Sequence, residues 1–289
     1  MLEATEVSTQ IVERIYLFLW SFIIGLVCLF FASRQGLLNS FSLSRLPYIR
    51  GFQVLFGFVF ILFSEIIVYV IGTSNNALIN NQIFFSENEK LWLVILGLLA
   101  STITTIMTLF ILNREQRVLL FKQDKTPWYV NIFKGMVVCF LSFPLIAAFN
   151  AFLSIITLYF YGIESQDQAA VKLLKEAMAY PLVFKITVFK IMVTIPFIEE
   201  FLFRGLLQNW LKRVLKYPIL GVIVASLVFA CFHYSKDQGI NNIEIISTIF
   251  FVGCILGFLY ERQRSLWASI GFHSIFNMIG ILNIYLFKG

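Results

Sequence analysis

Long apolar runs recur along the whole chain and constrain its fold more than any other feature. A helix needs about 20 mostly apolar residues to cross the hydrocarbon core of a bilayer. Of the 289 residues, 59% are hydrophobic and only 13% are charged, whereas soluble domains carry about 25% charged residues. The chain therefore has too little charge to cover a water-soluble domain. Eight candidate spans follow one another: 15–33, 52–73, 91–112, 136–160, 183–211, 217–235, 243–260 and 265–287.

These spans predict an all-α, multi-pass integral membrane protein, which lies in the plasma membrane if the source is bacterial. Lys and Arg concentrate in alternate connections between the spans. This topological bias explains the net charge of +6 without a nucleic-acid partner, and it predicts that both termini lie outside the cytoplasm. The four cysteines lie in apolar runs and form no CxxC pair, so neither a disulfide framework nor a structural zinc site is expected.

Two local features interrupt the pattern of apolar spans. The connection 163–180 contains the amphipathic stretch AAVKLLKEAMA, which is typical of a helix on the membrane surface or of a solvated loop helix. Pro144 and Pro196 lie inside apolar runs and predict kinks in their helices.

Ionisable residues inside the apolar runs are the informative ones, because a charge at the centre of a membrane helix costs about 2.5–3.5 kcal/mol. The run 195–210, IPFIEEFLFRGLLQNW, contains Glu199, Glu200 and Arg204. Glu200 and Arg204 are four residues apart, in the favourable order for an ion pair on one helix face. Glu199 points about 100° away around the helix. A purely structural ion-pair network leaves Glu199 unexplained, and this spare acid is suited to accept a proton.

The chain has only two histidines, and both lie in apolar runs. His233 ends the run LVFACFHY. His273 lies in SIGFHSIFNMIG, four residues before Asn277, so the imidazole and the carboxamide share a helix face and can donate to one ligand atom. On the spans given above, His233 is expected near the non-cytoplasmic end of its span, whereas Glu199 is expected near the middle of its own.

Glutamate and histidine within the spans leave few kinds of chemistry. Asp124, Asp167 and Asp237 all lie in connections, which excludes an intramembrane aspartyl protease. The H-E-x-x-H motif of zincins and the G-x-S-x-G elbow of serine hydrolases are absent. A nucleophile pair of Cys231 and His233 is excluded because residues two apart point to opposite sides of a helix. A water-activating site of Glu and His remains, with or without a metal ion.

Together these residues resemble the signature of the CPBP intramembrane proteases, the family of type II CaaX prenyl proteases and bacteriocin-processing proteins that is also called Abi. The signature has three short motifs, which stand here as Glu199-Glu200-x-x-x-Arg204, Phe229-x-x-x-His233 and His273-x-x-x-Asn277. The resemblance implies a bundle of about eight membrane helices that encloses a polar cavity. Residues 181–289 are then the catalytic helices, and residues 1–180 are N-terminal helices and an interfacial segment that match no family motif.

The resemblance also implies a reaction, the hydrolysis of a peptide bond by an intramembrane endopeptidase. A water molecule is then polarised between the carboxylate of Glu199 and the imidazole of His233. His273 and Asn277 donate to the oxyanion of the tetrahedral intermediate, which is the electrostatic task that usually contributes most to such catalysis. The partner is a peptide or a membrane-anchored protein within the lipid bilayer.

Two details of this implied site stay open at the level of sequence. Glu200 and Arg204 are expected to hold Glu199 in place. Both a metal-dependent and a metal-free glutamate mechanism are argued for the family, so the cofactor is undetermined. If a divalent metal such as zinc is bound, its expected ligands are Glu199, His233 and His273.

Two alternatives from other functional classes remain. One is a non-enzymatic immunity or scaffold protein of the same fold, which keeps the pocket to bind a peptide tail. The other is a proton-coupled transporter that uses Glu65, Glu199 and Glu200 as relays, because Glu65 lies alone within the second span.

Overall fold

The computed structural model describes residues 4–36, 47–74, 78–79, 82–83, 87–122, 125–163 and 169–286. Within these ranges the protein is a bundle of helices with a single two-stranded pairing, in which β1 (Leu78–Ile79) runs antiparallel to β2 (Gln82–Ile83). Asp124 and Asp167 lie outside the described residues. The all-α membrane bundle expected from the sequence is confirmed.

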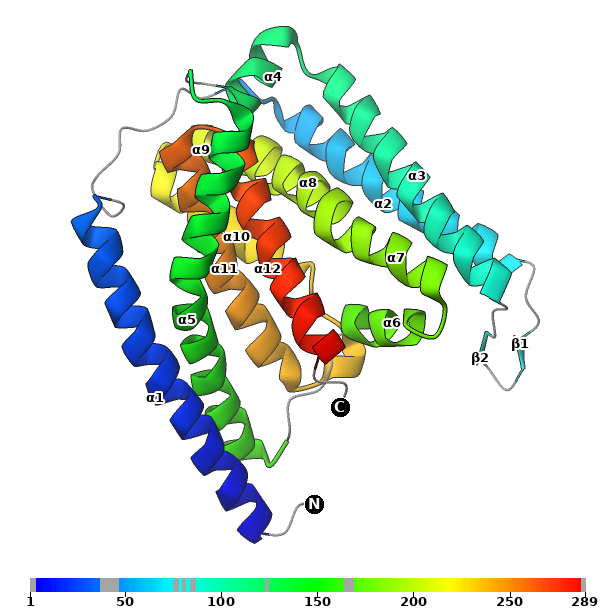
Figure 1. Ribbon diagram of the computed structural model, residues 1–289. Helices are drawn as coiled ribbons and strands as arrows, with labels where there is room; N and C mark the ends of the chain where they lie inside the picture. The colour runs from blue at the N-terminus through cyan, green and yellow to red at the C-terminus, as the bar shows by residue number, and fades with distance from the viewer. Residues whose placement is uncertain are drawn as a thin grey trace.

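Figure 1 shows the arrangement of the helices in the described chain. In chain order they are α1 (Ala4–Arg34), α2 (Gly51–Ser74), α3 (Glu87–Ile111), α4 (Arg114–Phe121), α5 (Trp128–Tyr161), α6 (Ala169–Ala177), α7 (Pro181–Phe189), η1 (Lys190–Thr194), α8 (Ile195–Glu199), η2 (Glu200–Gln208), α9 (Asn209–Leu215), α10 (Pro218–Cys231), η3 (Lys236–Gln238), α11 (Asn241–Gln263) and α12 (Leu266–Leu286).

Seven helices of the described chain are long and apolar enough to cross a membrane, and each matches a predicted span. The elements from α7 to α9 form one of them, a continuous helical span over Pro181–Leu215. The remaining predicted span, 217–235, contains α10, which has only 14 residues. It is about 21 Å long, shorter than the roughly 30 Å core of a bilayer. His233 lies two residues past the end of this short helix and is half-buried.

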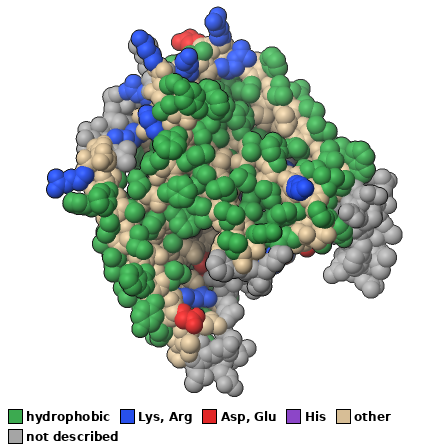
Figure 2. Space-filling view, viewed as in Figure 1, with side chains coloured by type: hydrophobic (Ala, Val, Ile, Leu, Met, Phe, Trp, Pro, Cys, Tyr) green, Lys and Arg blue, Asp and Glu red, His purple; other side chains and the backbone are tan. Residues whose placement is uncertain are grey.

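The outer face of the bundle is covered by hydrophobic side chains, whereas Lys and Arg gather at the end where α4 lies (Figure 2). Large apolar residues exposed on the described surface include Trp20, Phe63, Phe110, Phe133 and Tyr159. Such a surface suits lipid, and the chain is a multi-pass integral membrane protein. The N-terminal end of α1 and the C-terminal end of α12 point away from the basic end, which is the arrangement expected if both termini lie outside the cytoplasm (Figure 1).

Helices α5 and α12 lie so close that their backbones touch. A Cβ atom at Gly271 of α12 would collide with the carbonyl oxygen of Ile132, and one at Gly135 of α5 would collide with that of Ala268. Small residues permit this approach between membrane helices. The contact fixes the position of α12 two residues before His273.

The span Pro181–Leu215 is not a regular α-helix, because it contains the two π-helical stretches η1 and η2. Pro196, which has no backbone N–H to donate, lies just after η1 ends. The side chain of Asn209, the first residue of α9, donates to the carbonyl oxygens of Arg204 and Gly205 in η2, at 3.0 and 2.9 Å. Stretches of π-helix are rare and occur frequently at functional sites.

Two smaller expectations concern the rest of the chain. A short helix does form in the connection 163–180, and α6 lies across the bundle beside α7 and not along the spans (Figure 1). All four cysteines are free thiols, of which Cys139 is buried and Cys231 is exposed.

Candidate active site

Glu200 and Arg204 form a fully buried ion pair within η2. Their side chains are 0% exposed, and Arg204 Nε lies 3.3 Å from Glu200 Oε2. Arg204 Nη2 also donates to the carbonyl oxygen of Gly253 in α11, at 3.1 Å. The guanidinium lies 4.6 Å from the ring centre of Phe229 in α10, which is the geometry of a cation–π contact. Arg204 therefore connects the central span to two other helices.

His273 of α12 lies between the two adjacent glutamates. Its Nδ1 donates to Glu200 Oε1 at 3.0 Å, because a carboxylate oxygen can only accept. Its Nε2 lies 3.6 Å from Glu199 Oε2, which is too long for a hydrogen bond. Turns in a π-helix hold more residues than the 3.6 of an α-helix, so side chains at successive positions lie closer together around the axis. Glu199, which ends α8, and Glu200, which begins η2, thus both lie beside one imidazole.

Glu199 differs from Glu200 in its surroundings. Its side chain is 25% exposed. Among the described residues it accepts no hydrogen bond, and its contact with His273 is an ion pair only if the ring is protonated. The carboxylate of Glu199 is therefore accessible, whereas both oxygens of Glu200 contact other side chains, those of Arg204 and His273.

His233 follows the C-terminal end of α10, and its orientation is fixed by a backbone contact. Its Nδ1 lies 3.0 Å from the carbonyl oxygen of Phe229, so that nitrogen carries the hydrogen of this bond. The lone pair of the neutral ring is then on Nε2. The ring of Phe229 lies against both imidazoles, with centroid distances of 5.0 Å to His233 and 6.0 Å to His273.

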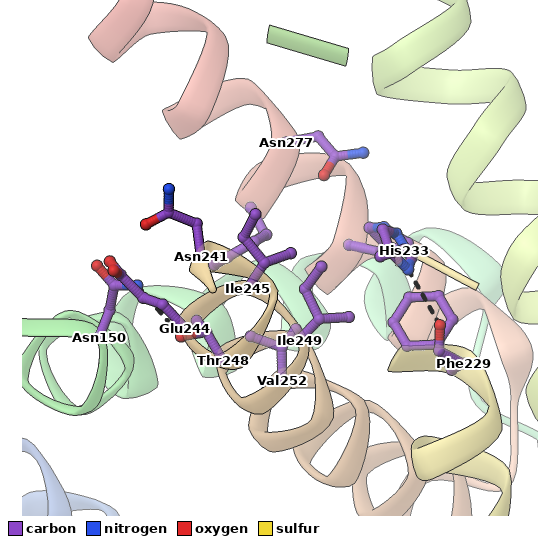
Figure 3. Close-up of a pocket in the computed structure, with 12 residues that line it drawn as sticks. Asn150, Phe229, His233, Asn241, Glu244, Ile245, Thr248, Ile249, Val252 and Asn277 are labelled. Atoms are coloured by element: carbon purple, nitrogen blue, oxygen red, sulfur yellow. Dashed lines mark hydrogen bonds between the residues drawn. The ribbon is translucent and has the colours of Figure 1, made fainter. Parts of the chain in front are cut away.

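Two cavities meet at His233. The first, of about 240 Å³, lies beside α11 and α12 and is lined by polar side chains that include Asn150, Asn241 and Thr248 (Figure 3). We call it the polar cavity. The second, of about 380 Å³, is walled mainly by apolar side chains of α2, α8 and η2, and also contains Glu199. We call it the apolar cavity. His233 lines both cavities, so polar and apolar groups can reach the same imidazole.

Asn277 lies one helical turn beyond His273 and also lines the polar cavity (Figure 3). Its amide nitrogen donates to the carbonyl oxygen of Ile191 in η1, at 2.9 Å. This bond ties α12 to the π-helical stretch. Since an asparagine amide nitrogen carries two hydrogens, one remains for a ligand.

The site residues do not form a metal centre in this arrangement. Among the residues that the structure describes, no three His, Cys, Asp or Glu side chains are grouped so that they could hold one metal ion. The Nδ1 atoms of both histidines are held by Phe229 and Glu200, which leaves Nε2 of each ring as the atom that could bind a metal. The predicted ligands Glu199, His233 and His273 are not grouped as a three-ligand metal site in the described chain.

A second buried polar network lies near the basic end, and its residues are not among the site residues predicted from the sequence. Lys212 of α9 pairs with Glu261 of α11 at 2.6 Å, and both are almost fully buried. Gln208 donates to the same carboxylate at 2.8 Å, and Asn209 donates to the hydroxyl of Tyr260. The signal in the sequence is the run Gln208-Asn209-x-x-Lys212 at the end of an apolar span.

Glu65, the residue on which the transporter alternative depends, belongs to α2. Its side chain lies outside the described part of the structure.

The fold and the site together define a class of protein. It is a multi-pass membrane bundle with a buried Glu/His centre beside two cavities. Residues 181–279, about a third of the chain, match the family model of the Type II CAAX prenyl endopeptidase Rce1-like proteins. The matched part of the chain is similar to this family of integral membrane proteases, and the match is consistent with the resemblance to the CPBP family. It contains all six predicted site residues. Comparisons with curated proteins and with solved structures found no match.

Proposed function

We propose that the protein is an intramembrane endopeptidase that hydrolyses a peptide bond of a membrane-associated peptide or protein. One observation carries the proposal. The carboxylate of Glu199 accepts no hydrogen bond within the described chain, and it lines the same cavity as His233. An accessible base and an imidazole lone pair beside one cavity can bind the two hydrogens of a single water molecule.

In the proposed reaction, Glu199 accepts one proton of this water while its other hydrogen bonds to Nε2 of His233. The water oxygen then forms a bond to the carbonyl carbon of the peptide, and the carbonyl oxygen becomes an oxyanion. When the intermediate collapses, the C–N bond breaks and Glu199 returns the proton to the leaving amine. Atoms and charge balance with these residues and water alone.

His273 and Asn277 are the proposed donors to the oxyanion. Glu200 holds the Nδ1 hydrogen of His273, which directs Nε2 of the ring toward Glu199 and the reacting carbonyl. When Nε2 carries a hydrogen, it and the free amide hydrogen of Asn277 can donate to the developing negative charge. Removing one such donor typically costs about a hundredfold to a thousandfold in rate.

The test uses the purified full chain in detergent and a library of synthetic peptides with apolar side chains, with products identified by mass spectrometry. We expect wild-type protein to release defined fragments, and Glu199→Gln and His233→Ala to release none. Glu176→Gln, which changes an exposed acid on α6, is the matched control and should cleave like wild type.

Cleavage by Glu199→Gln at the wild-type rate would show that the water-activating assignment is wrong. If no peptide is cleaved by any form while peptides still bind, the non-enzymatic alternative gains support.

A further inference from the structure

Lys190 lies where a cation is unexpected. It is the first residue of η1, inside the span Pro181–Leu215, and its side chain is partly buried. It lines the apolar cavity together with Glu199 and His233. Apart from Ser101, the other lining residues are apolar, and they include Leu62, Leu202 and Phe232. The described lining of the apolar cavity thus combines mostly apolar side chains with the ammonium group of Lys190.

The ammonium of Lys190 has no ionic partner in the described part of the chain. It shares the cavity with Glu199, but the two side chains form no ion pair. The chain makes room for the ammonium at Gly97 of α3, where a Cβ atom would lie only 3.1 Å from Nζ. An unpaired charge among apolar groups is costly, and an anion that enters the cavity would remove that cost.

The lining defines the chemistry of the ligand as an apolar body with one negative group. The carboxyl end of a peptide with apolar side chains has this chemistry, and so does an anionic lipid. The presence of Glu199 and His233 in the same cavity favours the peptide, because a resident lipid would occupy the space of the substrate. This step rests on the proposed function.

We propose that Lys190 binds the C-terminal carboxylate of the peptide substrate and thereby sets the distance between the chain end and the bond that is cut. The ammonium attracts the carboxylate, while the negative charge of Glu199 repels it. The chain end is therefore held at the Lys190 part of the cavity, and a carbonyl group further up the peptide lies beside Glu199. Lys190 is a specificity-determining residue in this scheme and takes no part in the proton transfers.

The test compares two probes that differ in one charge, acetylated tri-leucine with a free C-terminal carboxylate and the same peptide as its C-terminal amide. Binding to the purified full chain in neutral detergent is followed by titrated thermal stabilisation. We expect wild type to bind the acid about tenfold to a hundredfold more tightly than the amide, as for a charged hydrogen bond. Lys190→Met should bind both equally, and Lys190→Arg should keep most of the preference.

Lys185→Met is the matched control, since Lys185 lies in the same span but is exposed and outside the cavity. It should bind the two probes like wild type. Unfolding temperatures without peptide establish that each variant is folded. Equal binding of both probes by wild type, or a preference that survives in Lys190→Met or disappears in Lys185→Met, overturns the proposal.

Two further arms test whether the ligand is a lipid and whether the proposed water activation is correct. If vesicles of phosphatidylglycerol abolish the acid preference of wild type and vesicles of phosphatidylcholine do not, the ligand is a lipid and the proposal is overturned. Glu199→Gln should retain the acid preference although it does not cleave. If it retains the preference and also cleaves, the proposed water activation fails while the role of Lys190 stands.

Discussion

His273 donates a hydrogen bond of 3.0 Å from Nδ1 to Oε1 of Glu200, and this bond joins α12 to the buried π-helical stretch η2. The other oxygen of Glu200 faces Arg204, so both oxygens are engaged by other side chains. Glu199, the preceding residue, shares none of these contacts except the more distant edge of the same imidazole. Two adjacent carboxylates therefore have different surroundings: Glu200 holds the histidine, and Glu199 is accessible and is the proposed base.

This difference predicts opposite behaviour of two matched variants. Glu200→Gln leaves the buried guanidinium of Arg204 without a counter-charge and should lower the free energy of unfolding by about 3–5 kcal/mol. Glu199→Gln should change it by less than about 0.5 kcal/mol, because that carboxylate has no such partner. Reversible unfolding in mixed detergent measures both. The double variant Glu200→Gln with Arg204→Met should be less destabilised than the sum of its single changes, and additive effects would argue against the ion pair.

The variant His233→Asn tests separately the two proposed roles of His233, the hydrogen bond from Nδ1 that orients the ring and the binding of the attacking water by Nε2. The asparagine amide nitrogen can replace Nδ1 as donor to the carbonyl oxygen of Phe229, so the thermal stability should stay within a few degrees of wild type. Because the substitution removes Nε2, we expect peptide cleavage to fall by about a hundredfold or more. Cleavage is measured by mass spectrometry and stability by the unfolding temperature. An active His233→Asn variant would mean that Nε2 does not bind the attacking water.

The close packing of α5 and α12 predicts that Gly271 tolerates no side chain. In Gly271→Val the new side chain meets the backbone at Ile132, so the helices must separate at a cost of about 1–3 kcal/mol. His273 would move with α12, and activity should fall with stability. Gly280→Ala is the control on the same helix, where a Cβ meets nothing within 4 Å. That change should be neutral or stabilising by up to about 1 kcal/mol. Equal losses in the two variants would contradict the packing argument.

Chelation provides a test of the donor set. Because the predicted ligands do not converge into a group of three in the described chain, we expect cleavage to be unchanged after treatment with a strong chelator. The measurement compares peptide cleavage before and after chelation, with zinc added back. Loss on chelation and recovery with zinc would show that the side chains regroup around a metal during the reaction.

Much of the fold could be predicted from the sequence, because a segment that crosses a bilayer must be apolar over about 20 residues. Seven spans coincide with span-length helices, since an apolar run of about 20 residues has few other stable states in lipid. The ion pair of Glu200 and Arg204 also follows from spacing, because both residues lie within one turn of a single helix. The short α10 was not predictable, because apolar residues after Cys231 extend the hydrophobic run beyond the helix that forms.

The sequence alone determined that this is a membrane bundle, and which few polar residues could carry chemistry. It did so because a charge within an apolar run is too costly to persist without a structural or functional role. Only the tertiary structure decided which of those residues are in contact and which stay accessible. The contact of His273 with both glutamates, the accessible position of Glu199 and the ammonium of Lys190, which has no ionic partner among the described residues, all depend on how different elements meet. Such distances between remote segments are set by packing across the bundle, including the close approach of α5 and α12, and no spacing along one helix encodes them.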